Sequence, residues 1–176
     1  MWRRRREPID ESKRVVTDPE RSRKRTMDRA VRLLAAKPRS IAELRERLLE
    51  KLWTDAAIVD AVIEKLKEYG YLDDAQYARD LASSKLRQKP QGRRSLEQKL
   101  SQKKLDKQLL AEAIDAAYEK LPETDLLDTA IEKRIALKGM PDTREDLKKF
   151  YDHLMRRGFS YGLIREKLDA LKTRAM

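Results

Sequence analysis

A pattern of apolar residues recurs three times along this chain, and it constrains the fold more than any other feature. In each copy two apolar residues stand five apart, a polar residue follows, and more apolar residues come at helical spacing. The aligned positions are Leu44, Leu48, Trp53, Ile58 and Val62, then Leu96, Leu100, Leu105, Leu110 and Ile114, then Phe150, Leu154, Phe159, Ile164 and Leu168. From Leu48 onward the copies are offset by 52 and then 54 residues, without a gap. Such periods indicate small units that bury too little apolar surface alone and become stable by stacking.

The units are predicted to be helical. From Thr26 onward apolar residues recur three and four apart, glycine and proline fall between segments, and no run alternates with period two. Polar residues suited to N-caps are Ser40, Thr54, Asp73, Asp106, Thr143 and Ser160. These signals predict helices over about 27–36, 40–51, 54–70, 73–88, 92–103, 106–120, 124–138, 143–158 and 160–172. No strand is expected.

The fold class is therefore all-α, with three tandem three-helix repeats that form an elongated, curved array. We expect a first repeat over 26–72, a second over 73–121 and a third over 122–176. Residues 1–25 lack apolar periodicity, so they are predicted to form a basic, mostly disordered N-terminal arm, because they bury too little to offset the entropy of ordering.

Positive charge is concentrated in two segments. The chain has a net charge of +11, of which residues 1–25 carry +5 and residues 83–107 carry +7, while the remainder carries −1. A segregated excess of this kind favours a polyanionic partner. A solvated face with no partner is the alternative.

Several functional classes are not expected. The chain has no cysteine and one histidine, His153, so neither a disulfide framework nor a metal site is predicted, and His153 is expected to be a surface or half-buried structural residue. No apolar run is long enough for a membrane span, and no secretory signal is expected. We find no nucleophile–base constellation and no glycine-rich phosphate loop, so we expect no catalytic residue, no cofactor and no enzyme activity. The simplest location is the cytoplasm.

Three stretches resemble the bacterial RecX family: Arg39 to Arg45, Gly70 to Ala78, and Arg156 to Tyr161. The resemblance covers about residues 26–172. Two positions depart from the family pattern, because Leu52 and Lys104 stand where a glycine is expected before the apolar residue. The resemblance implies a protein that binds RecA in the groove of the RecA–DNA filament and damps its recombinase, ATPase and coprotease activities. It would thereby modulate DNA repair and the SOS response.

The second repeat holds the candidate binding face for RecA or DNA. Its residues are Lys85, Arg87, Lys89, Arg93, Arg94, Lys99, Lys103 and Lys104. Lys85 and Lys89 also suit the C-terminal end of a helix dipole, but Arg93 and Arg94 stand at a helix start, where the dipole disfavours cations. Accessory candidates are Arg3, Arg4, Arg5 and Arg6 in the arm and Arg156 and Arg157 near the C-terminus. The arginines of the arm could instead serve solubility. Arg156 and Arg157 could instead serve to cap a helix C-terminus.

The expected partners are the RecA nucleoprotein filament and DNA, single- or double-stranded, contacted directly or through the filament. We expect a monomer and no membrane association. The alternative function is a direct nucleic-acid-binding helical protein, acting in transcription or on RNA and not through RecA. Charge alone does not separate the two, whereas the resemblance favours the first.

Overall fold

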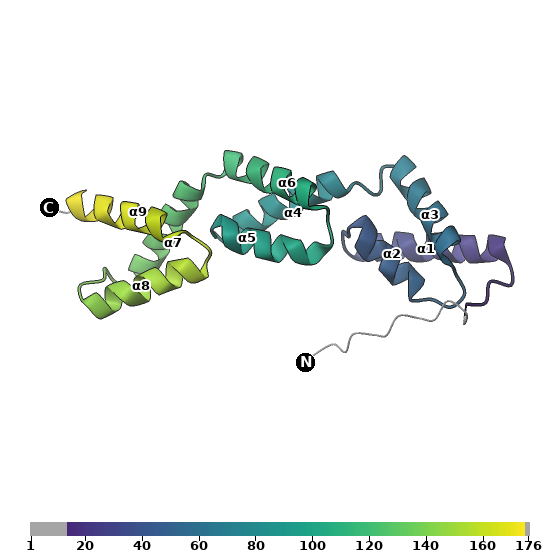
Figure 1. Ribbon diagram of the computed structural model, residues 1–176, viewed down its shortest axis with the longest axis horizontal. Helices are drawn as coiled ribbons and strands as arrows, with labels where there is room; N and C mark the ends of the chain where they lie inside the picture. The colour runs from purple at the N-terminus through teal and green to yellow at the C-terminus, as the bar shows by residue number, and fades with distance from the viewer. Residues whose placement is uncertain (1–13, 175–176) are drawn as a thin grey trace. The chain divides into compact units, whose positions relative to one another are not determined.

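The computed structural model describes residues 14–174, and every regular element among them is helical. Figure 1 shows them in chain order. They are α1 (Pro19–Ala36), α2 (Ile41–Leu49), α3 (Ala56–Glu68), α4 (Asp74–Gln88), α5 (Arg93–Leu100), the short 3₁₀ helix η2 (Ser101–Lys103), α6 (Lys107–Lys120), α7 (Glu123–Lys138), α8 (Arg144–Arg156) and α9 (Tyr161–Arg174). The all-α prediction and the three-helix repeats are confirmed. Arg3, Arg4, Arg5 and Arg6 lie outside the described residues.

Most of the predicted caps form as expected. The side chains of Ser40, Asp73, Asp106, Thr143 and Ser160 each accept a hydrogen bond from a backbone N–H in the first turn that follows. At the other end of α3, Gly70 has φ +73°, Gly70 N–H donates to Lys67 O, and Tyr71 N–H donates to Leu66 O. These are the two hydrogen bonds of a Schellman motif, which only a left-handed residue can close without strain.

The prediction that the first helix begins at about residue 27 is wrong. Helix α1 begins at Pro19, where Asp18 accepts a hydrogen bond from the Arg21 N–H at 3.0 Å. The extra turns bury Ser22 and Thr26, and the Thr26 hydroxyl donates to the Ser22 carbonyl. Because these buried side chains are small and polar, a search for apolar periodicity does not detect the helix they belong to.

Residues just before α1 are also tied to the first repeat. The Arg14 guanidinium donates to three carbonyl oxygens, those of Leu49, Lys51 and Thr54, at 2.8–3.0 Å. Val15 N–H donates to the Leu52 carbonyl at 3.0 Å. The described part of the expected arm is therefore ordered, because Arg14 satisfies carbonyls at the end of α2 and before α3.

Thr54 does not cap α3 as predicted. The Asp55 side chain caps this helix instead, accepting from Ile58 N–H at 2.8 Å. Thr54 is completely buried, and its hydroxyl oxygen lies 3.0 Å from that of Thr26. The first repeat thus differs from the other two by a one-residue shift of the cap.

The apolar positions that define the repeat form the cores. In all three copies the residues that align with Leu44, Leu48, Ile58 and Val62 are at most 8 % exposed. Leu105 and Phe159 are buried as well, whereas Trp53 is half-buried. Within the first repeat α1, α2 and α3 pack pairwise around Leu44, Leu48, Val62 and Leu66.

The chain forms two compact units, one up to Tyr77 and one from Ala78 onward. The second unit contains both α5–α6 and the α7–α9 bundle. Within it Gly92 N–H, at the start of α5, donates to the carbonyl of Arg157, at the end of α8. The buried Tyr118 hydroxyl donates to the Gln91 carbonyl at 3.0 Å. The Gly92–Arg157 bond joins the second repeat to the third, whereas the Tyr118–Gln91 bond lies within the second repeat.

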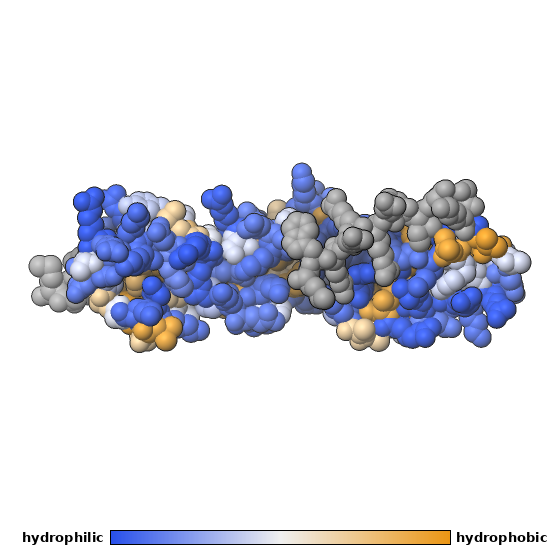
Figure 2. Space-filling model, turned by 90° about the horizontal axis from the view of Figure 1, so that it is seen from below, coloured by the Kyte–Doolittle hydropathy of each residue, from blue (hydrophilic) through white to orange (hydrophobic). Residues whose placement is uncertain are grey.

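The surface is predominantly polar. Hydrophilic residues cover most of the described surface on the face drawn in Figure 2, consistent with 41 % charged residues. Among the described residues, no helix combines the length and apolarity that crossing a membrane requires.

Candidate functional site

The structure brings together only some of the eight basic residues predicted as a binding face. Lys85, Arg87 and Lys89 lie in and just after the end of α4, and Arg93, Arg94 and Lys99 lie on α5. Lys103 is in η2, and Lys104 follows it with a left-handed φ of +55°. Three of the eight, Lys85, Lys89 and Lys99, lie close together.

Lys99 is at the centre of this group. Its ammonium donates to the side-chain carbonyl of Gln91, which is 2 % exposed and also accepts from the Ser95 hydroxyl at 3.2 Å. Burial lowers the pKa of Lys99, and the positive charges of Lys89, Lys85 and Arg157 lower it further. All three of these neighbours are cations.

Arg157 reaches this group from the third repeat. The Gly92–Arg157 backbone hydrogen bond of 2.9 Å holds the end of α8 against the start of α5. Burial lowers the pKa of Arg157, and its Nε is buried with no hydrogen-bond partner within the described chain. A guanidinium held in this way retains unused donor capacity.

His153 extends the group along α8. It is half-buried, as the sequence analysis predicts. Burial lowers its pKa, and the charges of Arg134, Arg157, Arg156 and Lys89 lower it further. The assembled set, here called the central cationic cluster, consists of Lys85, Lys89, Lys99, Arg134, His153, Arg156 and Arg157.

Arg93 belongs to a different environment. Its guanidinium pairs with Asp115 at 2.6 Å and lies 5.4 Å from the centre of the Tyr118 ring. Its backbone N–H donates to the Glu123 carboxylate at 3.0 Å. The hydrogen bond with Asp115 is the main cause of the raised pKa of Arg93. A cation at this helix start is therefore accommodated by carboxylates of the same chain and needs no external partner to explain it.

The sequence analysis did not select Arg134, and it treated Arg156 and Arg157 as accessory residues. Arg134 lies on α7, far in sequence from Lys89, and no helical spacing relates the two. The sequence signal that could have found this contact is Gly92 at the start of a helix, because glycine suits a position where another backbone approaches closely. Arg87 and Arg94 are exposed residues of α4 and α5.

The chemistry of the central cationic cluster suits a polyanion. Its positive charges are held together at a cost in electrostatic repulsion, which a bound phosphate or carboxylate would relieve. Arginine forks such as that of Arg157 suit bidentate contacts with either group. Among the described residues, no three histidine, cysteine or acidic side chains converge in an arrangement that could hold a metal ion.

Three family models match consecutive parts of the chain. The first three-helix domain of RecX matches residues 27–66, the second matches 73–114 and the third matches 122–168. The chain is 34% identical over 148 residues to the regulatory protein RecX of Chlorobium phaeobacteroides (strain BS1), covering 84% of this chain and 94% of that protein. It is 33% identical to the regulatory protein RecX of Prosthecochloris aestuarii (strain DSM 271 / SK 413), covering 85% of this chain and 95% of the relative.

Solved structures share the fold. The crystal structure of RecX from Lactobacillus salivarius superposes with a TM-score of 0.76 at 21% identity, covering 88% of this chain and 99% of that one. A crystal structure of a regulatory protein RecX superposes with a TM-score of 0.70 at 19% identity, covering 84% of this chain and 73% of the other.

Proposed function

This chain belongs to the RecX family, and on that premise we propose that it is a non-catalytic negative modulator of RecA that binds the RecA–DNA filament in the cytoplasm. In this role it inhibits the recombinase, ATPase and coprotease activities of RecA and thereby regulates DNA repair and the SOS response.

The central cationic cluster is the observation that carries the proposal beyond family membership. A nucleoprotein filament presents DNA phosphates and protein carboxylates, and a cluster of cations without an intervening acid is attracted to both. Lys99 and Arg157 are the anchor residues of the proposal, because the Lys99 ammonium is held by the buried Gln91 side chain and the Arg157 backbone is held by the Gly92 N–H. Groups that are already positioned lose less entropy on binding.

Tandem repeats favour a filament as the target. A protein with several linked contact surfaces binds a repeating partner more strongly than any one contact would allow. If the bound state prefers one filament conformation, or one filament end, then binding shifts the filament equilibrium by mass action. No chemical step by this chain is required.

The proposal is tested by RecA ATPase and strand exchange on single-stranded DNA, with this protein titrated below the RecA concentration. Affinity for the same DNA without RecA is measured in parallel. We expect inhibition at concentrations that leave bare DNA unbound. Tight binding to bare DNA without inhibition would favour the alternative, a nucleic-acid-binding protein that does not act through RecA.

The role of the cluster is tested with a Lys85→Ala/Lys89→Ala/Arg157→Ala variant. The matched control, Lys107→Ala/Lys120→Ala/Lys138→Ala, removes the same charge from exposed lysines of the same unit. We expect the first variant to lose inhibition and the control to retain it. The salt dependence of binding should fall by about 0.7 in log–log slope for each single-strand phosphate contact removed. Equal inhibition by both variants would show that the cluster is not the contact site.

A further inference from the structure

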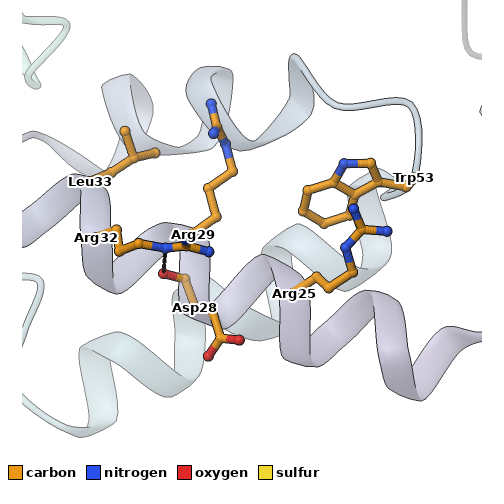
Figure 3. A pocket seen from close by; sticks show the side chains of 6 residues that line it. All are labelled: Arg25, Asp28, Arg29, Arg32, Leu33 and Trp53. Carbon is orange, nitrogen blue, oxygen red and sulfur yellow. Dashed lines mark hydrogen bonds between the residues drawn. The ribbon is translucent and has the colours of Figure 1, made fainter.

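A second group of cations lies in the first repeat and shares no residue with the central cationic cluster. Arg25, Arg29 and Arg32 recur at helical spacing on one side of α1, with Trp53 facing them across a cavity of about 290 Å³. Asp28 and Leu33 complete the lining (Figure 3). The cavity is entirely within the unit that ends at Tyr77.

The three arginines are held but not neutralised. The Arg25 guanidinium lies 4.5 Å from the centre of the Trp53 ring, and Arg32 Nε donates to the Asp28 carbonyl at 3.1 Å. Arg29 Nε is buried without a hydrogen-bond partner. Within residues 14–174 none of the three forms an ion pair with a carboxylate.

Asp28 is the one acid among the described residues that line the cavity, and it does not compensate Arg29. In Figure 3 the guanidinium of Arg29 and the carboxylate of Asp28 point in opposite directions from α1. Within the described chain Arg29 therefore keeps an Nε–H donor without a partner, on a residue that lines the cavity. An anionic group that enters would meet this donor directly.

The spacing of the cations and the nature of the opposite wall identify the ligand class. Successive turns of α1 advance about 5.4 Å, so Arg25, Arg29 and Arg32 form a row suited to successive charges on a chain. Trp53 supplies a flat aromatic face. A cationic row beside an aromatic ring is the combination that binds single-stranded nucleic acid, because phosphates contact the cations while a base stacks on the ring. Acidic side chains of a peptide would use the row but have no group that needs the indole.

We propose that this cavity is a nucleotide subsite for single-stranded nucleic acid. One base stacks on Trp53, where it displaces or covers the Arg25 guanidinium, and the flanking phosphates bind Arg29 and Arg32. The subsite does not depend on the proposed action on RecA.

The test uses the intrinsic fluorescence of Trp53. The chain contains two tryptophans, Trp2 and Trp53, so a Trp2→Phe protein makes Trp53 the sole reporter. We expect titration with a twelve-nucleotide oligothymidylate to quench this fluorescence saturably. The signal reports the surroundings of Trp53, and the same titration of the cluster variant Lys85→Ala/Lys89→Ala/Arg157→Ala separates it from binding at the central cationic cluster. Absence of quenching in the wild-type pocket would overturn the proposal.

Variants assign the contacts. In the Trp2→Phe background, Arg29→Gln/Arg32→Gln should abolish quenching, whereas Arg23→Gln/Lys24→Gln, an equal charge change on exposed residues of the same helix, should preserve it. Trp53→Leu should weaken binding of a labelled oligonucleotide at this subsite about 5- to 150-fold, measured with the cluster variant Lys85→Ala/Lys89→Ala/Arg157→Ala as host. Trp53→Phe keeps an aromatic ring on which a base can stack. It should therefore retain most of the affinity, even if Trp53→Leu weakens binding partly by loosening the fold.

Equal quenching by an oligoglutamate peptide would instead identify a site for an acidic protein segment and reject the nucleotide assignment. Because RecA is absent, failure here leaves the proposed function intact, and failure of the RecA assay leaves the subsite intact.

Discussion

The backbones of Gly92 and Gly158 are in direct contact. A Cβ on Gly92 would clash with the carbonyl oxygen of Gly158, and a Cβ on Gly158 would lie 2.5 Å from the Cβ of Ser95. Gly158 also has φ +89°, a conformation that disfavours other residues. The contact sets the end of α8 against α5, and so places Arg157 beside Lys99.

This contact predicts a large effect of one methyl group. Gly92→Ala should destabilise the second unit by about 1–3 kcal/mol, because backbone must move to admit the Cβ. It should also weaken polyanion binding, since Arg157 would shift. Denaturant unfolding measures the first effect. Gly162→Ala is the control, because a Cβ there meets nothing within 4 Å, and this helical site should gain up to about 1 kcal/mol. Equal stability of the two variants would contradict the close approach.

Arg93 and Lys89 should respond in opposite ways to replacement by alanine. Arg93→Ala removes the Asp115 ion pair and the contact with Tyr118, so we expect a loss of about 1 kcal/mol in unfolding free energy and little change in filament affinity. Lys89→Ala removes a charge that other cations repel, so affinity should fall while stability changes by less than about 0.5 kcal/mol. Unfolding curves and salt-dependent binding of both variants provide the comparison. If Arg93→Ala lowered the affinity for the filament and Lys89→Ala did not, Arg93 would belong to the binding face after all.

The ionisation of His153 should report on the central cationic cluster. Its pKa is lowered in the folded chain by burial and by nearby cations, so the unfolded chain binds the proton more readily. Stability contributed by neutral His153 is therefore present above pH 6.5 and is lost as the pH falls below that value. Proton NMR resolves the titration without assignment, because the chain has one histidine.

Two changes should move this pKa upward. Arg157→Gln removes one of the positive charges that repel a proton on His153. Bound oligonucleotide or polyphosphate compensates several of these positive charges. Arg144→Gln, which is not among the charges that shift His153, should leave the titration unchanged. If polyphosphate binds without raising the pKa of His153, the anion occupies another site.

Lys104 occupies the position that Gly158 occupies in the third repeat, and it has φ +55°. A left-handed conformation costs a residue with a Cβ about 1–2 kcal/mol, partly offset by the greater chain entropy of glycine when unfolded. Lys104→Gly should therefore stabilise the protein by up to about 1 kcal/mol. Thermal unfolding tests this, with Lys120→Gly, at the end of α6, expected to destabilise by a similar amount. A decrease in stability for Lys104→Gly would mean that the lysine side chain contributes more than the backbone strain costs.

The family resemblance, the three repeats and most helix ends were predictable from the sequence because they depend on local interactions. A cap such as Asp106 acts on N–H groups two and three residues ahead, and helical periodicity identifies buried positions such as Leu48 and Ile164. The predicted start of α1 failed because Ser22 and Thr26 are buried against residues more than twenty-five positions away, including Thr54.

The candidate functional sites, in contrast, were decided by tertiary packing. The linear charge count correctly indicated Lys85, Lys89 and Lys99 as neighbours, but it grouped Arg93 with them although Arg93 pairs with Asp115. The sequence analysis left out Arg134 and kept Arg157 only as an accessory candidate, because only the packing of α7 and α8 near α5 brings these residues close. Electrostatic interaction depends on distance in space and on exposure to solvent, and neither follows from separation along the chain. Amino-acid order determined which segments become helices and which residues are charged, and the folded structure decided which charges are neutralised and which remain available to a partner.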